Sequence, residues 1–181
     1  MPVAPRKRGK PSVAETTGTW PTPWGRMGFV RGENGLRRIV LPHYSPQDLR
    51  DLLAWEHPGA TVDDEAFAEL AAECRAYFNG EPVAFGTVQC DLSTVGPFAR
   101  KILTSCRQIA YGQTRTYSQL ATMAGEQGKA RATAQALGRN PLPLVIPCHR
   151  VVAAGGRLGG FSAPGGVQIK RKMIELETPR S

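Results

Sequence analysis

The chain has 181 residues, 41% of them hydrophobic, which is typical of one or two globular domains. No apolar run reaches the length of a membrane span and no signal-peptide core follows the basic start, so we expect a cytoplasmic protein (nuclear in a eukaryote) without membrane contact. The net charge is +8, and residues 97–181 alone carry 13 Lys and Arg against 3 Asp and Glu. This basic half favours a polyanionic partner, most simply nucleic acid.

Residues 1–19 are rich in Arg, Lys, Pro, Gly and Thr and are expected to form a flexible basic tail. A first domain is predicted over 20–96. Short alternating apolar stretches over 21–42, separated by glycines, predict a small antiparallel sheet. Further elements expected in this domain are helices over 48–54 and 63–78 and a strand over 83–92.

A second domain is predicted over 97–181, beginning with a helix over 97–109. Thr116 and Gln119 have the spacing of a capping box, which predicts the start of a short helix. Gly125 would end that helix, and another is expected over 128–137. Two short helices joined by a tight turn are typical of a helix-turn-helix, which by pattern alone binds the major groove of DNA.

Basic and small side chains alternate on the second of these helices. Lys129 and Arg131 are candidates for phosphate or base contacts, as is Arg139 just after the helix. Ala130 and its small neighbours would let a sugar-phosphate chain approach closely. We therefore expect this helix to contact DNA.

The four cysteines, Cys74, Cys90, Cys106 and Cys148, stand singly without CxxC pairs, which predicts reduced thiols and no metal site. Residues 142–146 form an apolar run between two prolines and predict a buried strand that delivers Cys148 to a turn. A lone buried cysteine is most often a small core residue. The polar His149 and Arg150 that follow favour a reactive thiol instead.

The string over 140–152, Asn-Pro-x-Pro-x-x-Ile-Pro-Cys-His-Arg-Val-Val, resembles the active-site signature of the O6-alkylguanine-DNA alkyltransferases, or methylated-DNA–protein-cysteine methyltransferases. Residues 116–121, 130–132 and 165–167 are also similar to that family. The resemblance implies an α/β (α+β) fold, with a small ribonuclease-H-like N-terminal domain. It also implies a mostly helical, winged-helix-like domain that carries the cysteine.

The resemblance implies DNA repair by direct damage reversal. An alkyl group on the O6 atom of guanine in double-stranded DNA would pass irreversibly to Cys148 after base flipping, so that each molecule acts once; the O4 atom of thymine is left open as a second target. Glu177 would orient His149, which would take the Cys148 proton through a water. Tyr117 would donate a proton toward the guanine ring, and Asn140 would tie the turn to the active-site segment.

The remaining implied roles concern the DNA and the pocket. Arg131 matches an arginine that enters the base stack from the minor groove, and Thr116 lies beside Tyr117 at the DNA. The Val151 carbonyl and the Ser162 backbone would bind the guanine. The pocket wall contains Gly159, Gly160 and Phe161, where the family usually has a tyrosine in place of Phe161, and the loop that follows is longer than the commonest form. Some members of the family carry zinc near the N-terminus, but the first 42 residues here contain neither Cys nor His, so we expect no metal or cofactor, and a monomer.

Two other functions fit parts of the sequence. An alkyltransferase-like damage sensor would flip the base and transfer nothing, but such proteins lack the cysteine that stands here at 148. A Cys-His hydrolase or thiol transferase acting on small molecules would leave the basic helix-turn-helix unexplained.

Overall fold

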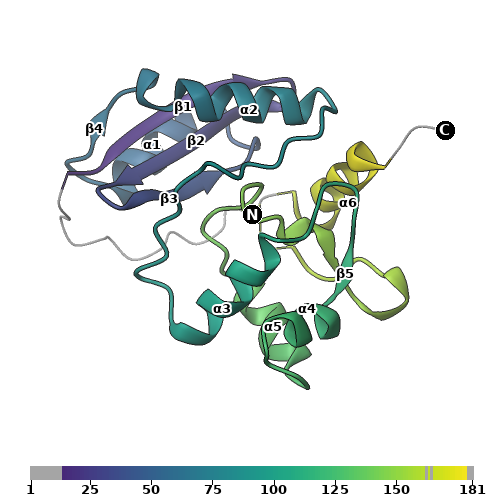
Figure 1. Ribbon diagram of the computed structural model, residues 1–181. Coiled ribbons are helices and arrows are strands. Elements are labelled where there is room, and N and C mark those ends of the chain that lie inside the picture. The colour runs from purple at the N-terminus through teal and green to yellow at the C-terminus, as the bar shows by residue number, and fades with distance from the viewer. Residues whose placement is uncertain (1–13, 162, 164, 179–181) are drawn as a thin grey trace. The chain divides into compact units, whose positions relative to one another are not determined.

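The computed structural model describes residues 14–161, 163 and 165–178 (Figure 1). The chain divides into two compact units between Asp91 and Leu92, slightly before the predicted boundary at residues 96 and 97. Within the described part, no helix is long and apolar enough to cross a membrane.

A four-stranded sheet forms the first unit, in the order β3-β2-β1-β4. β1, β2 and β3 form an antiparallel meander, and β4 pairs parallel to β1. The sheet predicted over 21–42 is confirmed, but its first strand starts earlier, so residues 16–19 belong to the sheet and not to a tail. The strands are β1 (Thr16–Thr22), β2 (Gly25–Gly32), β3 (Gly35–Val40) and β4 (Thr61–Val62).

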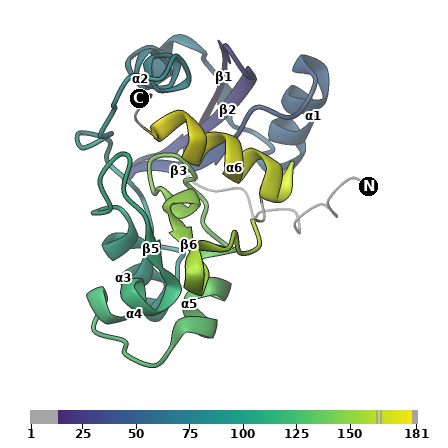
Figure 2. The same ribbon diagram turned by 90° about the vertical axis from the view of Figure 1, so that its right-hand side faces the viewer.

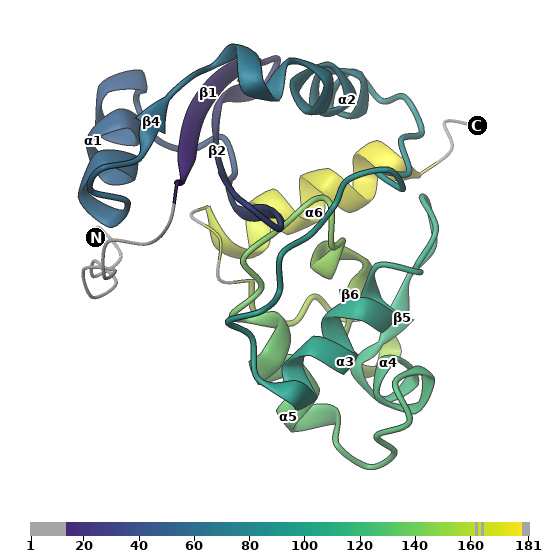
Figure 3. The same ribbon diagram turned by 60° about the vertical axis from the view of Figure 1, so that its left-hand side comes forward.

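Two helices cover opposite faces of this sheet (Figure 3). Alternation along β2 explains the arrangement, because successive side chains of a strand point to opposite faces. Val30 packs with residues of α1 (Pro46–Glu56), whereas Phe29 stacks on Phe67 at the approach to α2 (Ala68–Phe78). Each large side chain buried here contributes about 1.5–3 kcal/mol.

Two predictions for the first unit need correction, and one strand was missed. The helix expected over 63–78 is divided into a 3-10 turn η1 (Glu65–Phe67) and α2. No strand forms over 83–92, where Phe85 adopts a left-handed φ of 50° and a single bridge joins Cys90 to Leu36. β4 was not predicted, because two exposed residues carry no periodic signal.

In the second unit, three helices pack against one another. Figures 2 and 3 show β5 beside β6, forming a two-stranded parallel sheet. The predicted helix over 97–109 ends at Cys106. The elements are α3 (Pro97–Cys106), β5 (Arg115–Thr116), α4 (Tyr117–Met123), α5 (Ala130–Leu137), η2 (Cys148–Arg150), β6 (Val151–Val152), η3 (Ala154–Gly156) and α6 (Gly166–Glu177).

The helix-turn-helix is present as α4 and α5. The predicted capping box starts α4: the Thr116 side chain accepts from the Gln119 backbone N–H, and the Gln119 side chain accepts from the Thr116 N–H. Gly125 and Gly128 bend the turn with φ of 72° and 78°, in the left-handed region that favours glycine. α5 begins at Ala130, slightly later than predicted.

Candidate active site

The segment before Cys148 is an irregular turn held by one amide side chain. Asn140 Nδ2 donates to the carbonyl of Ile146 at 2.9 Å, and Asn140 Oδ1 accepts from the N–H of Leu142 at 3.0 Å. Within this turn Leu144 is buried with a φ of 79°. The strand predicted over 142–146 is therefore wrong, because a left-handed residue and a local side-chain clamp replace the extended backbone.

Cys148 opens the 3-10 turn η2 and is only 7% exposed. Burial raises the pKa of its thiol, while a hydrogen bond with Asn140 and the charge of Lys170 act in the opposite direction. The resting form at neutral pH is therefore the thiol. Reaction as a nucleophile requires a base to take its proton.

The base candidate lies next in the chain and faces a buried carboxylate. His149 Nε2 lies 2.7 Å from Glu177 Oε1, and both side chains are buried. Burial lowers the pKa of His149, an effect that Glu177 opposes and that Arg150 and Lys170 reinforce. A neutral imidazole beside a carboxylate carries its proton on the nitrogen that faces it, so Nε2 holds the proton and Nδ1 is the basic atom.

Arg150 is a site residue to which the sequence assigned no role. Its Nε and Nη2 donate to the two oxygens of Glu177 at 2.8 and 3.0 Å, and Nη1 donates to the carbonyl of Ile109 at 2.7 Å. Burial alone would raise the pKa of Glu177, but hydrogen bonds from His149 and Arg150 lower it to about 2. Glu177 is thus ionised at neutral pH and forms a bidentate pair with Arg150.

Lys170 on α6 is a second side chain whose place the sequence left open. It is 1% exposed, and its Nζ donates to the carbonyl of Val151 at 2.6 Å. Burial lowers its pKa, while negative charge on the nearby Cys148 or Cys106, when either is a thiolate, acts in the opposite direction. The signal was present: Lys170 shares the helical spacing of the buried Met173 and Glu177.

Two aromatic rings and a glycine stand beside this lysine. Lys170 Nζ lies 5.8 Å from the ring centre of Tyr117 and 5.9 Å from that of Phe161. A Cβ on Gly159 would collide with the Tyr117 hydroxyl, so backbone closely abuts the phenol. Burial raises the pKa of Tyr117, and a thiolate at Cys148 raises it further, so Tyr117 keeps its proton available for donation. Gly160 is exposed, and the predicted contact of Ser162 lies outside the described residues.

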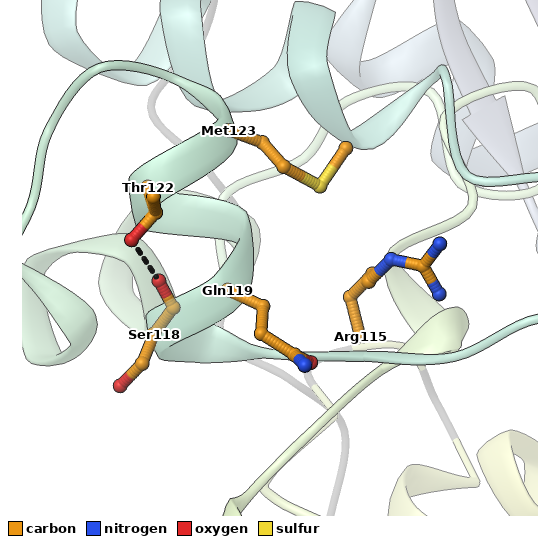
Figure 4. A pocket seen from close by; sticks show the side chains of 5 residues that line it. All are labelled: Arg115, Ser118, Gln119, Thr122 and Met123. Carbon is orange, nitrogen blue, oxygen red and sulfur yellow. Dashed lines mark hydrogen bonds between the residues drawn. The ribbon is translucent and has the colours of Figure 1, made fainter.

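The predicted DNA-contacting residues lie on the helix-turn-helix. Arg131 and Arg139 are exposed, whereas Lys129 is occupied by an ion pair with Glu126 at 2.6 Å. The outer face of α4 bears a shallow hollow of about 380 Å³ that was not predicted (Figure 4). Its walls are formed by Arg115, Ser118, Gln119, Thr122 and Met123.

Among the described residues, no group of three His, Cys, Asp or Glu side chains is arranged to hold a metal ion. The side chains brought together are a thiol, an imidazole, a carboxylate, a guanidinium and an ammonium. Beside a helix-turn-helix, this set defines a DNA-binding protein with a nucleophilic cysteine.

Comparison with known proteins agrees with this class. Residues 97–179 match the family model described as the DNA-binding domain of 6-O-methylguanine DNA methyltransferase. A methylated-DNA–protein-cysteine methyltransferase of Sulfolobus acidocaldarius is 34% identical over 88% of this chain and 91% of its own length. One from Mycobacterium tuberculosis is 39% identical over 67% of this chain and 71% of its own length.

Solved structures give the same result. O6-methylguanine methyltransferase of Mycobacterium tuberculosis superposes with a TM-score of 0.74 at 31% identity, covering 92% of this chain and 94% of that one. The same organism's protein in complex with DNA gives 0.73 at 31% identity, covering 90% and 92%. The chain belongs to the methylated-DNA–protein-cysteine methyltransferase family, which confirms the predicted two-domain α/β fold. It is a DNA-repair enzyme that transfers an alkyl group to a cysteine, and DNA is its partner.

Proposed function

We propose that the acceptor is Cys148 and that the donor is the O6 atom of alkylated guanine in duplex DNA. The observation that carries this proposal is the buried thiol at the start of η2, followed directly by a histidine that is paired with a buried carboxylate. A soft thiolate suits attack on an alkyl carbon.

Proton transfer comes first. Nδ1 of His149 takes the Cys148 proton through a water, and the Glu177 anion stabilises the imidazolium that forms. Arg150 fixes both carboxylate oxygens, so Glu177 cannot rotate away from the ring. Lys170 adds a positive charge beside the thiolate.

Alkyl transfer then forms the sulfur–carbon bond and breaks the bond from the alkyl carbon to O6. The electron pair of the broken bond goes to the guanine, which receives a proton from Tyr117, and the Tyr117 proton is restored from the imidazolium. The net change moves one proton from Cys148 to guanine and leaves a thioether on the sulfur. A thioether is a poor leaving group, so each molecule reacts once.

The damaged base must leave the stack to reach a buried sulfur. Arg131, exposed in the first turn of α5, fills the space left in the duplex and offsets part of the few kcal/mol that flipping costs. We place the flipped guanine beside Tyr117, with the backbone of residues 159–161 as a wall of its pocket; this backbone abuts the phenol in the structure and has to shift to admit the base. The Val151 carbonyl already accepts from Lys170, and its second lone pair can accept from the guanine amine. We propose a monomer that acts in the cytoplasm.

Intact-mass and peptide analysis tests the proposal after incubation with duplex DNA that carries one O6-methylguanine. We expect a stoichiometric gain of one CH2 on the Cys148 peptide, absent with unmodified duplex and absent in Cys148→Ala. Binding without any mass gain would identify a damage sensor instead. Turnover of small thioesters or disulfides without DNA would identify a hydrolase or thiol transferase.

A further inference from the structure

Glu126 joins three helices of the second unit through its carboxylate. It lies in the turn between α4 and α5, where Oε1 is 2.9 Å from Lys101 Nζ on α3 and Oε2 is 2.6 Å from Lys129 Nζ at the start of α5. Its side chain is only 11% exposed, although both lysines are largely exposed. Lys129 Nζ also lies 5.5 Å from the ring centre of Phe98 on α3.

The backbone of the turn reinforces this arrangement. The Glu126 N–H donates to the carbonyl of Ala121 at 2.8 Å, and the Lys129 N–H donates to the carbonyl of Glu126 at 3.2 Å. Thr133 N–H then donates to the Lys129 carbonyl, which begins the hydrogen bonding of α5. These hydrogen bonds couple the position of Glu126 to that of the first turn of α5, where Arg131 is exposed.

Glu126 is negatively charged in a part of the chain that is otherwise strongly basic. Only three acids occur in residues 97–181, and Glu126 is the one within the helix-turn-helix. Hydrogen bonds from Lys129 and Lys101 lower its pKa, so it stays ionised at neutral pH. An anion there repels DNA phosphates and occupies two cations that could bind them. Because this anion weakens DNA binding, an effect on DNA affinity alone does not explain its presence.

We propose that Glu126 is a positioning residue that fixes the first turn of α5, and so Arg131, while withholding Lys101 and Lys129 from non-specific phosphate contacts. The inference rests on the role proposed above for Arg131. Glu126 lowers the affinity for undamaged DNA, and in return it keeps Arg131, the arginine that supports base flipping, in its correct position. Loss of its charge therefore moves affinity and reaction rate in opposite directions.

The test compares the full-length wild type with Glu126→Gln and with Glu175→Gln, which removes one acid from the exposed part of α6. For undamaged duplex, Glu126→Gln should bind more tightly, with a log–log salt dependence steeper by about 0.9 for each lysine released. The single-turnover rate of transfer from saturating O6-methylguanine duplex should fall about tenfold, as expected for a misplaced positioning group. Glu175→Gln should change neither the salt slope nor this rate.

Reaction with the free O6-methylguanine base needs no bound duplex. It therefore distinguishes a positioning role on DNA from a general disruption of the active site by the substitution. Its rate should be the same in Glu126→Gln and wild type, and a fall would overturn the inference. In an Arg131→Ala background, Glu126→Gln should cause no further loss of the duplex rate. An undiminished loss there would show that Glu126 does not act through Arg131.

Folding is checked by the thermal midpoint. If Glu126→Gln is unfolded, Lys129→Gln breaks the ion pair from the other side; it should lower the saturating duplex rate without raising DNA affinity. An unchanged saturating rate in the folded variant overturns the inference while wild type still alkylates Cys148. Failure of wild type to alkylate Cys148 overturns the proposed function instead.

Discussion

The ammonium of Lys170 lies 2.6 Å from the carbonyl oxygen of Val151, and both residues are buried beside the reactive thiol. Among the described residues this neutral carbonyl is its hydrogen-bond acceptor, and a buried cation so held retains most of its field, because little water screens it. Its charge lowers the pKa of Cys148 and also that of His149. Lys170 therefore favours the thiolate but opposes the imidazolium, and the first effect bears directly on the nucleophile.

Lys170→Met keeps the length and apolar stem of the side chain and removes its charge. We expect the plateau rate of alkyl transfer to fall about tenfold, because the ammonium no longer lowers the pKa of Cys148 and so no longer favours its thiolate. The acid limb of the rate profile should move to higher pH, because the charge no longer lowers the pKa of His149. Single-turnover rates across pH measure both effects, with Lys172→Met on the exposed side of α6 as the control. An unchanged plateau would show that the cation does not assist the thiolate.

Glu177 makes stability depend on pH in a defined direction. Its pKa in the folded protein is about 2, below the ordinary value of 4.5. Its contribution to the free energy of unfolding is therefore complete above pH 4.5 and is lost as the pH falls toward 2. The shift corresponds to about 3 kcal/mol for a group buried in this pair. Urea unfolding of wild type and Glu177→Gln should therefore give a large difference at pH 7 that narrows below pH 4.5. A constant difference would contradict the ion-pair account.

In the second unit, sequence patterns a few residues long correctly predicted the features that depend only on neighbouring residues. The capping box of Thr116 and Gln119 and the bend at Gly125 set the helix-turn-helix through contacts only a few residues apart. The Arg150 contact with Glu177 joins residues 27 positions apart, and no periodicity encodes it. The apolar run before Cys148 was mistaken for a strand, because it gives no sign of the Asn140 clamp.

His149 gives a prediction for acidic conditions. Burial lowers its pKa below 6.5, so the ring stays neutral and able to accept the Cys148 proton at pH values where an exposed histidine would be charged. Transfer should therefore persist as the pH falls through 6.5, with its acid limb at lower pH. Single-turnover rates from pH 4.5 to 8 test this, because a midpoint at or above 6.5 would mean that another group limits the reaction. His149→Ala should have a much lower transfer rate, and its pH–rate profile should no longer show the acid limb.

Asn140 controls the shape of the turn that precedes the thiol. Asn140→Ala leaves a buried carbonyl and an N–H of this turn without their side-chain partner, which should lower the free energy of unfolding by about 1–3 kcal/mol. The left-handed Leu144 would lose the clamp that holds it, so Cys148 should also be less well placed. Urea unfolding and the transfer rate of the folded variant measure the two effects, with Gln108→Ala at an exposed position just after α3 as the control. A variant that loses stability but keeps its full transfer rate would limit Asn140 to a role in folding.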